Sequence, residues 1–419
     1  MKPVWIKLAV IYCLFGFSNA VLKLLATSRV DESLASWFSI YFASVMIVAA
    51  GFIFLKRRQV YILLMKNKPL FLFLAYMAVS CLWALDPSLS FMSVIRYIVS
   101  ALFGLFLLAC FSEKDLLGIF AVTLGAIAIS SLLIGLFLPA YGLINDKGPN
   151  HGSWQGAFTS RNGFAIFMNI AFFIFMSASM RFSNWQKPFL TLAALAVLLI
   201  ILSGSGTGLI MLVLISTLPF ALKMLRFRTT LIISILLAAI SMGAFLFAAF
   251  DVKPDSSQIF GVLGKSPTLT GRTDTWQGIW YSARKTDAER LLFGYGAQDL
   301  NFTTGGLLIL ESDARLTKAS PGPEMDDRAA KPIDNAYVGI LLKFGIIGAA
   351  ILLVSFLKAL LIALHEAKTS TTPLANFYFI IMLVLLINGI TESVERQTLI
   401  WIFFTLILAR PYIKKGENG

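Results

Sequence analysis

Residues 331–356 read KPIDNAYVGILLKFGIIGAAILLVSF, a long apolar run with a polar entrance. A helix needs about 20 predominantly apolar residues to cross the roughly 30 Å hydrocarbon core of a bilayer. The run that follows Asn335 meets this requirement, with Lys343 as its one charged residue. The stretch therefore predicts a membrane-spanning helix, and it raises the question of why Asp334 and Asn335 stand at its start.

Similar apolar runs recur along the whole chain of 419 residues. Hydrophobic residues make up 58% of the sequence and charged residues only 14%, against about 25% charged in a soluble domain. The mean hydropathy is +0.81. We predict an all-α polytopic membrane protein, with its first run retained rather than cleaved as a signal peptide. About twelve spans are expected, over residues 4–24, 36–55, 69–85, 89–111, 116–138, 163–180, 188–203, 207–222, 230–250, 336–364, 374–391 and 397–410.

The placement of positive charge predicts the side of the membrane on which each loop lies. Basic residues gather in alternate loops, and short basic loops stay in the cytoplasm. Both termini are therefore expected in the cytoplasm. The chain divides into nine spans within 1–250, a large outer loop at 251–335, and three spans with a cytoplasmic tail at 336–419. The basic loops carry Lys56, Arg57, Arg58, Lys66, Lys68, Arg181, Lys187, Lys223, Arg226, Arg228, Lys414 and Lys415.

The net charge of +13 does not predict a nucleic-acid partner. The outer loop is nearly neutral, so the excess of 35 Lys and Arg over 22 Asp and Glu mainly anchors the chain in the membrane. The three cysteines lie in apolar runs and predict neither a disulfide framework nor a metal site. The sequence has no nucleotide-phosphate loop, and we expect no cofactor and no metal.

The outer loop has two parts. Residues 271–296, GRTDTWQGIWYSARKTDAERLLFGYG, place Trp276 and Trp280 at helical spacing, and the final GYG predicts the end of a helix. Residues 311–332 are polar and contain Pro and Gly, a composition typical of a mobile segment.

Polar residues at the predicted outer face, next to lipid, indicate a chemistry. The planar fork of an arginine binds phosphate oxygens bidentately. A nearby carboxylate can take a proton from a hydroxyl group. Together these groups suit the transfer of a group from a lipid diphosphate to an alcohol. The candidates are Arg161, Asn162, Arg272, Asp274, Asp334, Asn335, Glu392, Glu395 and Arg396.

Each candidate also has a structural interpretation. Asp334 suits the N-cap of the helix that follows it, a position that Asp favours. Arg272 suits an ion pair with Asp274 or Asp334. Arg161 suits an ordinary anchor at the membrane interface.

Other polar residues can likewise be interpreted as functional or as structural. Glu392 and Arg396 are spaced i, i+4 and suit a local ion pair. Arg96 lies just inside a span and Lys343 lies about two turns into its helix. An ionisable group at such a position is functional by default but can also reach the interface. The stretch LSGSGTG at 202–208 suits a tight turn between two spans.

Five segments stand out along the chain: SCLWALDPSLSFMSVIRYI (80–98), FTSRNGFA (158–165), LSGSGTGLI (202–210), residues 271–296, and IDNAYVGILLKFGIIG (333–348). Their order and spacing resemble the O-antigen ligase/Wzy polymerase superfamily. The resemblance covers about residues 75–400 and implies a bacterial inner-membrane glycosyltransferase with a GT-C-type helical fold. It further implies an undecaprenyl-diphosphate-linked glycan donor, no metal, no nucleotide sugar, and inversion at the anomeric carbon.

Two departures from the ligase pattern favour a polymerase of O-antigen or exopolysaccharide repeats. Ligases carry His before the Asn, and Asp334 stands at that position here. Ligases usually carry Arg after the second Ser of the S-x-S turn, and here that residue is Gly206.

The resemblance implies catalytic roles for Asp334 and Arg272. The implied partners are a lipid-linked oligosaccharide donor, a glycan acceptor, membrane lipids, and a chain-length regulator and flippase of the same pathway. The alternatives are an O-antigen ligase that transfers glycan to lipid A-core and, more remotely, a polysaccharide-lipid flippase. A flippase tends to show paired repeats and a site at the membrane midplane. The residues expected to contact diphosphate or glycan are Arg161, Asn162, Asn335, Arg96, Glu392 and Arg396.

Overall fold

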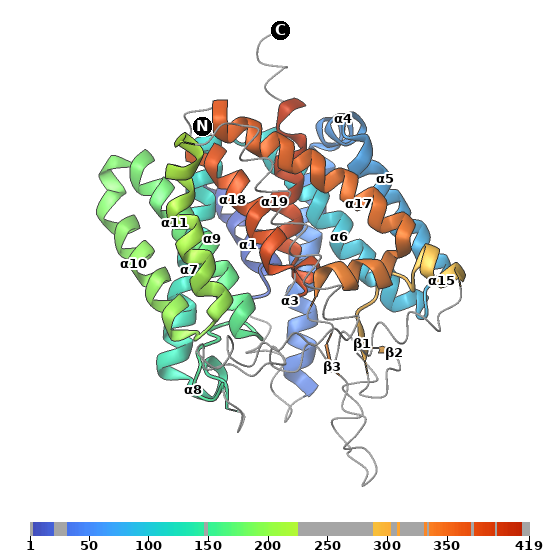
Figure 1. Ribbon diagram of the computed structural model, residues 1–419, viewed down its shortest axis with the longest axis horizontal. Coiled ribbons are helices and arrows are strands. Elements are labelled where there is room, and N and C mark those ends of the chain that lie inside the picture. Colours follow the sequence, from blue (N-terminus) through green and yellow to red (C-terminus); the bar gives the residue numbers. More distant parts are fainter. Residues whose placement is uncertain are drawn as a thin grey trace.

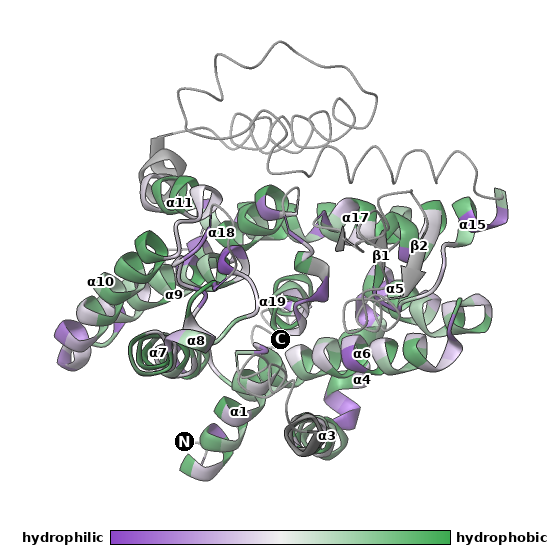
Figure 2. Cartoon of the chain, turned by 90° about the horizontal axis from the view of Figure 1, so that it is seen from below, coloured by the Kyte–Doolittle hydropathy of each residue, from purple (hydrophilic) through white to green (hydrophobic). Residues whose placement is uncertain are grey.

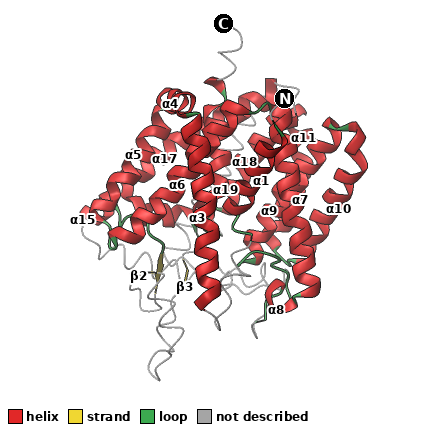
Figure 3. Cartoon of the chain, turned by 180° about the vertical axis from the view of Figure 1, so that it is seen from behind, coloured by secondary structure: helices red, strands yellow, loops and turns green. Residues whose placement is uncertain are grey.

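The computed structural model describes residues 3–20, 32–145, 150–224, 288–302, 308–310, 331–332, 335–369, 373–389 and 392–412. This part of the chain is almost entirely helical, as predicted. The helices run between two ends of the molecule, and the first and last described residues lie at one end (Figure 1). Three short strands and most of the loops lie at the opposite end, which is called here the loop end (Figures 1 and 3).

The first half of the chain forms helices close to the predicted spans. Pro87 opens one of them behind the Asp86 cap, whose Oδ1 accepts the Ser88 and Leu89 N–H groups at 2.9 and 3.0 Å. The helices are α1 (Val4–Phe17), α3 (Glu32–Leu55), α4 (Arg57–Lys66), α5 (Lys68–Val79), η1 (Ser80–Trp83), α6 (Pro87–Cys110), α7 (Glu113–Phe137) and α8 (Pro139–Gly142).

The second half is also helical. Its helices are α9 (Arg161–Arg181), η2 (Ser183–Trp185), α10 (Gln186–Leu202), α11 (Gly206–Met224), α15 (Ala288–Phe293), α17 (Ala336–Thr369), α18 (Pro373–Asn388), η5 (Val394–Arg396) and α19 (Thr398–Ala409).

Five helices within the described residues are long and apolar enough to cross a membrane. The number rises to six if α3 and α4, bent by 85° between Leu55 and Arg57, form one broken span. Shorter apolar helices accompany them, and together they suggest an integral membrane protein. The predicted span 230–250 lies outside the described residues, and the count of twelve stays a prediction. The five are Pro87–Cys110, Glu113–Phe137, Arg161–Arg181, Ser183–Leu202 and Ala336–Thr369.

One predicted loop is a helix. Residues 56–68 are rich in Lys and Arg, and we predicted them as a basic cytoplasmic loop between two spans. They form α4 instead, because Val60 and Leu63, three residues apart on one helical face, are buried against the neighbouring helices.

The core is centred on α19, every residue of which is buried. It packs most extensively against α6, and it lies among α1, α6 and α17 in the view from the loop end (Figure 2). The two backbones approach closely at Gly104 of α6, where an added Cβ would lie 2.9 Å from the Ile402 carbonyl oxygen. Small residues permit this kind of contact between membrane helices.

Helix α17 is broken near the loop end. Gly345 has φ 61° and ψ −172°, a conformation open almost only to glycine. The break leaves carbonyl groups without partners inside the helix. The segment after α15 supplies hydrogen-bond donors to these carbonyl groups. Tyr295 N–H donates to Leu342 O at 2.8 Å, and Gly296 N–H donates to Lys343 O at 3.0 Å. Residues 293–296 therefore dock directly onto the break.

Helix α15 ends where the sequence predicted. Its last residue is Phe293, and Gly294 follows with φ 79°, so GYG does end the helix. The earlier part of the segment, with Trp276 and Trp280, lies outside the described residues. So do residues 311–330, which we expected to be mobile.

A small antiparallel sheet was not predicted. It contains β1 (Leu300–Phe302), β2 (Leu308–Leu310) and β3 (Lys331–Pro332), in the order β2-β1-β3. Leu300 faces Leu310 across one pair, and Asn301 faces Pro332 across the other. Strands this short carry too little alternation for a sequence pattern to reveal them.

Candidate active site

Segments that the sequence assigned to the outer side come together at the loop end. Trp154 N–H donates to Leu202 O at 3.1 Å, which joins the loop before α9 to the end of α10. Ala336 N–H donates to Gly389 O at 2.7 Å, which joins the start of α17 to the end of α18. Two groups of polar side chains lie among these segments.

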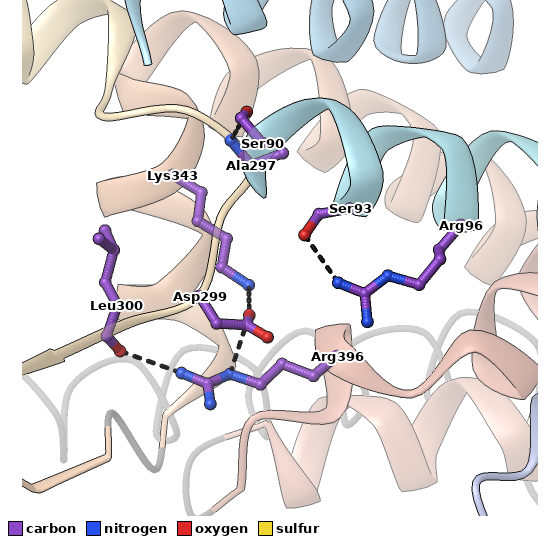
Figure 4. Close-up of polar contacts among 8 residues, drawn as sticks. All are labelled: Ser90, Ser93, Arg96, Ala297, Asp299, Leu300, Lys343 and Arg396. Carbon is purple, nitrogen blue, oxygen red and sulfur yellow. Dashed lines mark hydrogen bonds and ion pairs between the residues drawn. The ribbon is translucent and has the colours of Figure 1, made fainter. Parts of the chain in front are cut away.

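The first group, called here the cation cluster, consists of Arg96, Lys343 and Arg396 around Asp299 (Figure 4). Lys343 Nζ donates to Asp299 Oδ1 at 2.7 Å. Arg396 Nε lies 3.3 Å from the same oxygen, and its Nη2 donates to the Leu300 carbonyl at 3.1 Å. Three elements far apart in the sequence, the 297–300 segment, α17 and η5, therefore meet at one carboxylate, and Arg96 of α6 adds its positive charge nearby.

Backbone contacts fix the position of Asp299. Ala297 N–H donates to Ser90 Oγ at 2.8 Å, which ties the segment to α6. Gly296 N–H donates to the Lys343 carbonyl, so the same segment is tied to the residue whose side chain it contacts. Asp299 thus stands between α6 and α17 on a segment that is held at both sides.

The cation cluster is only partly buried. The Lys343 side chain is 2% exposed, while the side chains of Arg396 and Asp299 are 21% and 24% exposed. The Lys343 ammonium also lies 6.0 Å from the centre of the Tyr97 ring. Arg96 is held from α6, where its Nη2 donates to Ser93 Oγ at 2.9 Å. Asp299 and Arg396 are therefore partly exposed, whereas Lys343 beside them is buried.

The charges of the cluster favour an anion. Burial by itself would raise the pKa of the Asp299 carboxyl group. The positive charges of Lys343, Arg396 and Arg96 outweigh burial and hold that pKa well below its usual range. Asp299 is therefore ionised at neutral pH, and the four side chains together carry a net charge of +2.

The second group, called here the Glu392 cluster, joins the starts of α9 and α11 to the segment after α18. Asn162 Nδ2 donates to Glu392 Oε1 at 2.7 Å, and Ser205 Oγ donates to Asn162 Oδ1 at 2.8 Å. Ser160 Oγ lies 3.4 Å from Glu392 Oε2. Arg161 Nη1 donates to the Gly204 carbonyl at 3.1 Å. A carboxylate, an amide, two hydroxyl groups and a guanidinium thus share one small region.

Helix starts place these side chains. Ser160 is the N-cap of α9, and its Oγ accepts the Gly163 N–H at 3.2 Å. Ser205 plays the same part for α11 by accepting the Gly208 N–H at 3.1 Å. The stretch LSGSGTG is a tight turn between α10 and α11, as expected, with Gly204 at φ 60°.

The two clusters share one short segment. Glu392 contacts α9, whereas Arg396 contacts Asp299, although the two residues are only four apart. The sequence suggested that they form a pair with each other. The structure instead connects each of them to a different cluster.

Asn335 takes the structural position that we expected for Asp334. Helix α17 begins at Ala336, and Asn335 Oδ1 accepts the Val338 N–H at 3.1 Å. Asn335 is fully buried and is the N-cap. The cap lies one residue later than expected, because the helix itself starts one residue later. Asp334, Arg272 and Asp274 lie outside the described residues, so their roles stay predictions.

Sequence reasoning did not single out Asp299. It lies three residues after GYG, in a stretch that carries no family-like motif of its own. One signal was present, because Lys343 in an apolar helix requires a counter-charge. The sequence did not identify that partner, which lies 44 residues away.

A comparison with models of known protein families found a match over part of the chain. Residues 191–353 match the family model described as O-antigen ligase. None of the curated proteins matches the chain. The matched range includes Asp299 and Lys343, whereas Arg96, Glu392 and Arg396 lie outside it. Residues 191–353 are thus similar to the O-antigen ligase family, which is consistent with the Wzy/O-antigen ligase superfamily that the motifs resemble.

Proposed function

We propose that this protein is a Wzy-type polymerase that joins lipid-diphosphate-linked oligosaccharide repeat units. It works in the bacterial inner membrane, with both termini in the cytoplasm and the loop end in the periplasm. Its donor is a repeat unit on undecaprenyl diphosphate, and its acceptor is a hydroxyl group of a second glycan. A flippase supplies the donor and a chain-length regulator acts on the product.

The observation that carries this proposal is the cation cluster at the loop end. Breaking a glycosyl–phosphate bond leaves additional negative charge on the departing diphosphate. Arg396 and Arg96 offer planar forks that suit phosphate oxygens, and Lys343 adds a compact positive charge. A net charge of +2 among these side chains supports a dianionic or trianionic group more than a neutral sugar.

In this proposal the Glu392 cluster binds the glycan. Carboxylate, amide and hydroxyl groups are the side chains that form hydrogen bonds with sugar hydroxyl groups. Asn162, Arg161 and Glu392 are assigned to the glycan, and Asn335 holds the adjacent segment in place. Because residues 392–396 connect the two clusters, donor diphosphate and glycan are held side by side.

The reaction transfers one glycosyl group. The acceptor oxygen attacks the anomeric carbon and forms a new C–O bond, while the bond from that carbon to the phosphate oxygen breaks. The lipid diphosphate leaves with the electron pair, stabilised by the cation cluster and by Arg272. Asp334 takes the proton of the acceptor hydroxyl. Attack opposite the leaving group inverts the anomeric carbon, and this step uses no metal.

Polymerase is preferred to ligase because of two residues. Asp334 stands where ligase-like relatives carry His, and Gly206 stands where they usually carry Arg. In this chain Arg161 brings a guanidinium to the same turn, through its hydrogen bond to Gly204. A ligase that passes finished glycan to lipid A-core is the nearest alternative.

The test is the size of the surface glycan in a strain that lacks this gene. Loss of a polymerase leaves at most single repeat units on the surface acceptor. Loss of a ligase leaves the acceptor bare while long lipid-linked polymer accumulates. Purified protein in liposomes with lipid-linked repeats completes the test: a polymerase forms longer lipid-linked chains. Unchanged repeat units in that assay would contradict the proposed activity and favour a flippase.

A further inference from the structure

Asp299 is a carboxylate at the centre of a site proposed to bind an anion. Its Oδ1 contacts both Lys343 Nζ, at 2.7 Å, and Arg396 Nε, at 3.3 Å. The bound substrate presents phosphate oxygens to these same cations. Asp299 therefore occupies, within the protein, the kind of position that a phosphate oxygen takes.

Two roles are open to such a carboxylate, and its ionisation decides between them. A general base must take up a proton near the working pH. The cations around Asp299 keep its pKa well below the usual range, so it remains ionised and is a poor base. Its effect on the reaction is therefore that of a fixed negative charge.

The exposed fractions of the three side chains indicate that Asp299 and a ligand can contact the same cations. Lys343 is 2% exposed and needs a counter-charge to be tolerated there. Asp299 and Arg396 are each more than a fifth exposed, so a ligand can approach both. The partly exposed carboxylate and guanidinium thus leave a ligand access to the cations that Asp299 contacts.

We propose that Asp299 is a positioning residue that shares Lys343 and Arg396 with the bound diphosphate and thereby keeps the site's affinity for diphosphate moderate. The inference rests on the proposed function and names a way of regulating the same site. A moderate affinity helps the enzyme to release the lipid diphosphate product. Uniformly tight binding of diphosphate holds substrate and product alike and does not raise turnover. Product release limits many enzymes.

The experiment measures diphosphate binding to the purified full-length protein in lipid nanodiscs by calorimetry. The probes are farnesyl diphosphate and inorganic pyrophosphate, with farnesol as the uncharged control. Asp299→Asn keeps the size of the side chain and removes its charge, so the cluster rises from +2 to +3. We expect affinity for both diphosphates to rise at least tenfold, which corresponds to about 1.4 kcal/mol. Farnesol binding stays unchanged, and glycan polymerisation per enzyme falls.

A matched pair of variants keeps the test valid if Asp299→Asn alone does not fold. Lys343→Met replaces the buried lysine with an unbranched apolar side chain of similar length. Adding Asp299→Asn to Lys343→Met leaves no unpaired buried ammonium, and it restores the wild-type net charge. We expect the double variant to bind farnesyl diphosphate at least tenfold more tightly than Lys343→Met alone, and within about threefold of wild type.

The possible outcomes separate this inference from the proposed function. Unchanged or weaker binding on removal of Asp299, in both backgrounds, overturns the sharing role and leaves the proposed function standing. Arg396→Gln is expected to weaken binding, and unchanged affinity there overturns the anion site itself. If no variant binds either diphosphate, both proposals fall.

Discussion

Replacement of Gly345 by alanine tests whether the break in α17 organises the site. With φ 61° and ψ −172°, this residue occupies a backbone region that alanine adopts only at a cost of about 1–3 kcal/mol. An added Cβ would also lie 2.2 Å from the Leu292 carbonyl oxygen and 2.6 Å from the Gly294 nitrogen. Backbone atoms cannot move aside as a flexible side chain does. We therefore expect residues 292–296 to be displaced from the break.

The displacement has a specific result. Tyr295 and Gly296 lose their hydrogen bonds to Leu342 and Lys343 carbonyls, so their amides should exchange with deuterium faster. Asp299 moves with the segment and no longer holds Lys343 and Arg396. Activity should fall at least tenfold, and the thermal unfolding temperature should drop.

The matched control is Gly51→Ala in α3. An added Cβ at Gly51 meets nothing within 4 Å, and alanine is favoured over glycine in a helix by about 1 kcal/mol. That variant should keep or slightly gain thermal stability and retain activity. If Gly345→Ala matched it in exchange rates, stability and activity, the break would have no organising role.

Three further predictions concern the site and the topology. Arg396→Lys keeps the positive charge but loses the planar fork of the guanidinium. Polymer formation should therefore fall at least tenfold at equal protein level, a loss of about 1.4 kcal/mol in transition-state binding. Near-normal activity would show that a point charge suffices. Asp334→Asn should abolish polymer formation while thermal stability stays unchanged. Partial activity in Asp334→His would indicate that His can take over the proton-accepting role. Full activity in Asp334→Asn would remove Asp334 from the mechanism. Cysteine at Ser320 should react with a membrane-impermeant maleimide in spheroplasts and cysteine at Ser183 should not; the reverse pattern would invert the topology.

Local signals in the sequence were sufficient for much of the fold. The apolar runs 89–111 and 163–180 predicted helices, and these helices are observed at Pro87–Cys110 and Arg161–Arg181. The glycine after Phe293 marks a helix end. These features depend on neighbours within a few residues, so the sequence pattern contains them.

The site depends instead on contacts between distant segments. Asp299 and Lys343 meet because α17 breaks and the 293–296 segment fills the break, and neither event is visible in hydropathy. The cap at Asn335 rather than Asp334 depends on where the start of α17 meets the end of α18. Helix α4 was taken for a loop because its charges concealed the two apolar residues that are buried. Tertiary packing decided each of these cases.

Under the proposed function, the four-residue separation of Glu392 and Arg396 restricts how the sugar preference can change. Both residues lie on one short connection, so lengthening or shortening it would move Arg396, assigned to the diphosphate, together with Glu392, assigned to the glycan. Asn162 at the start of α9 donates to Glu392, and Ser205 before α11 donates to Asn162. Substitutions at these two helix starts therefore offer a route to a different repeat unit that leaves the cations around Asp299 in place.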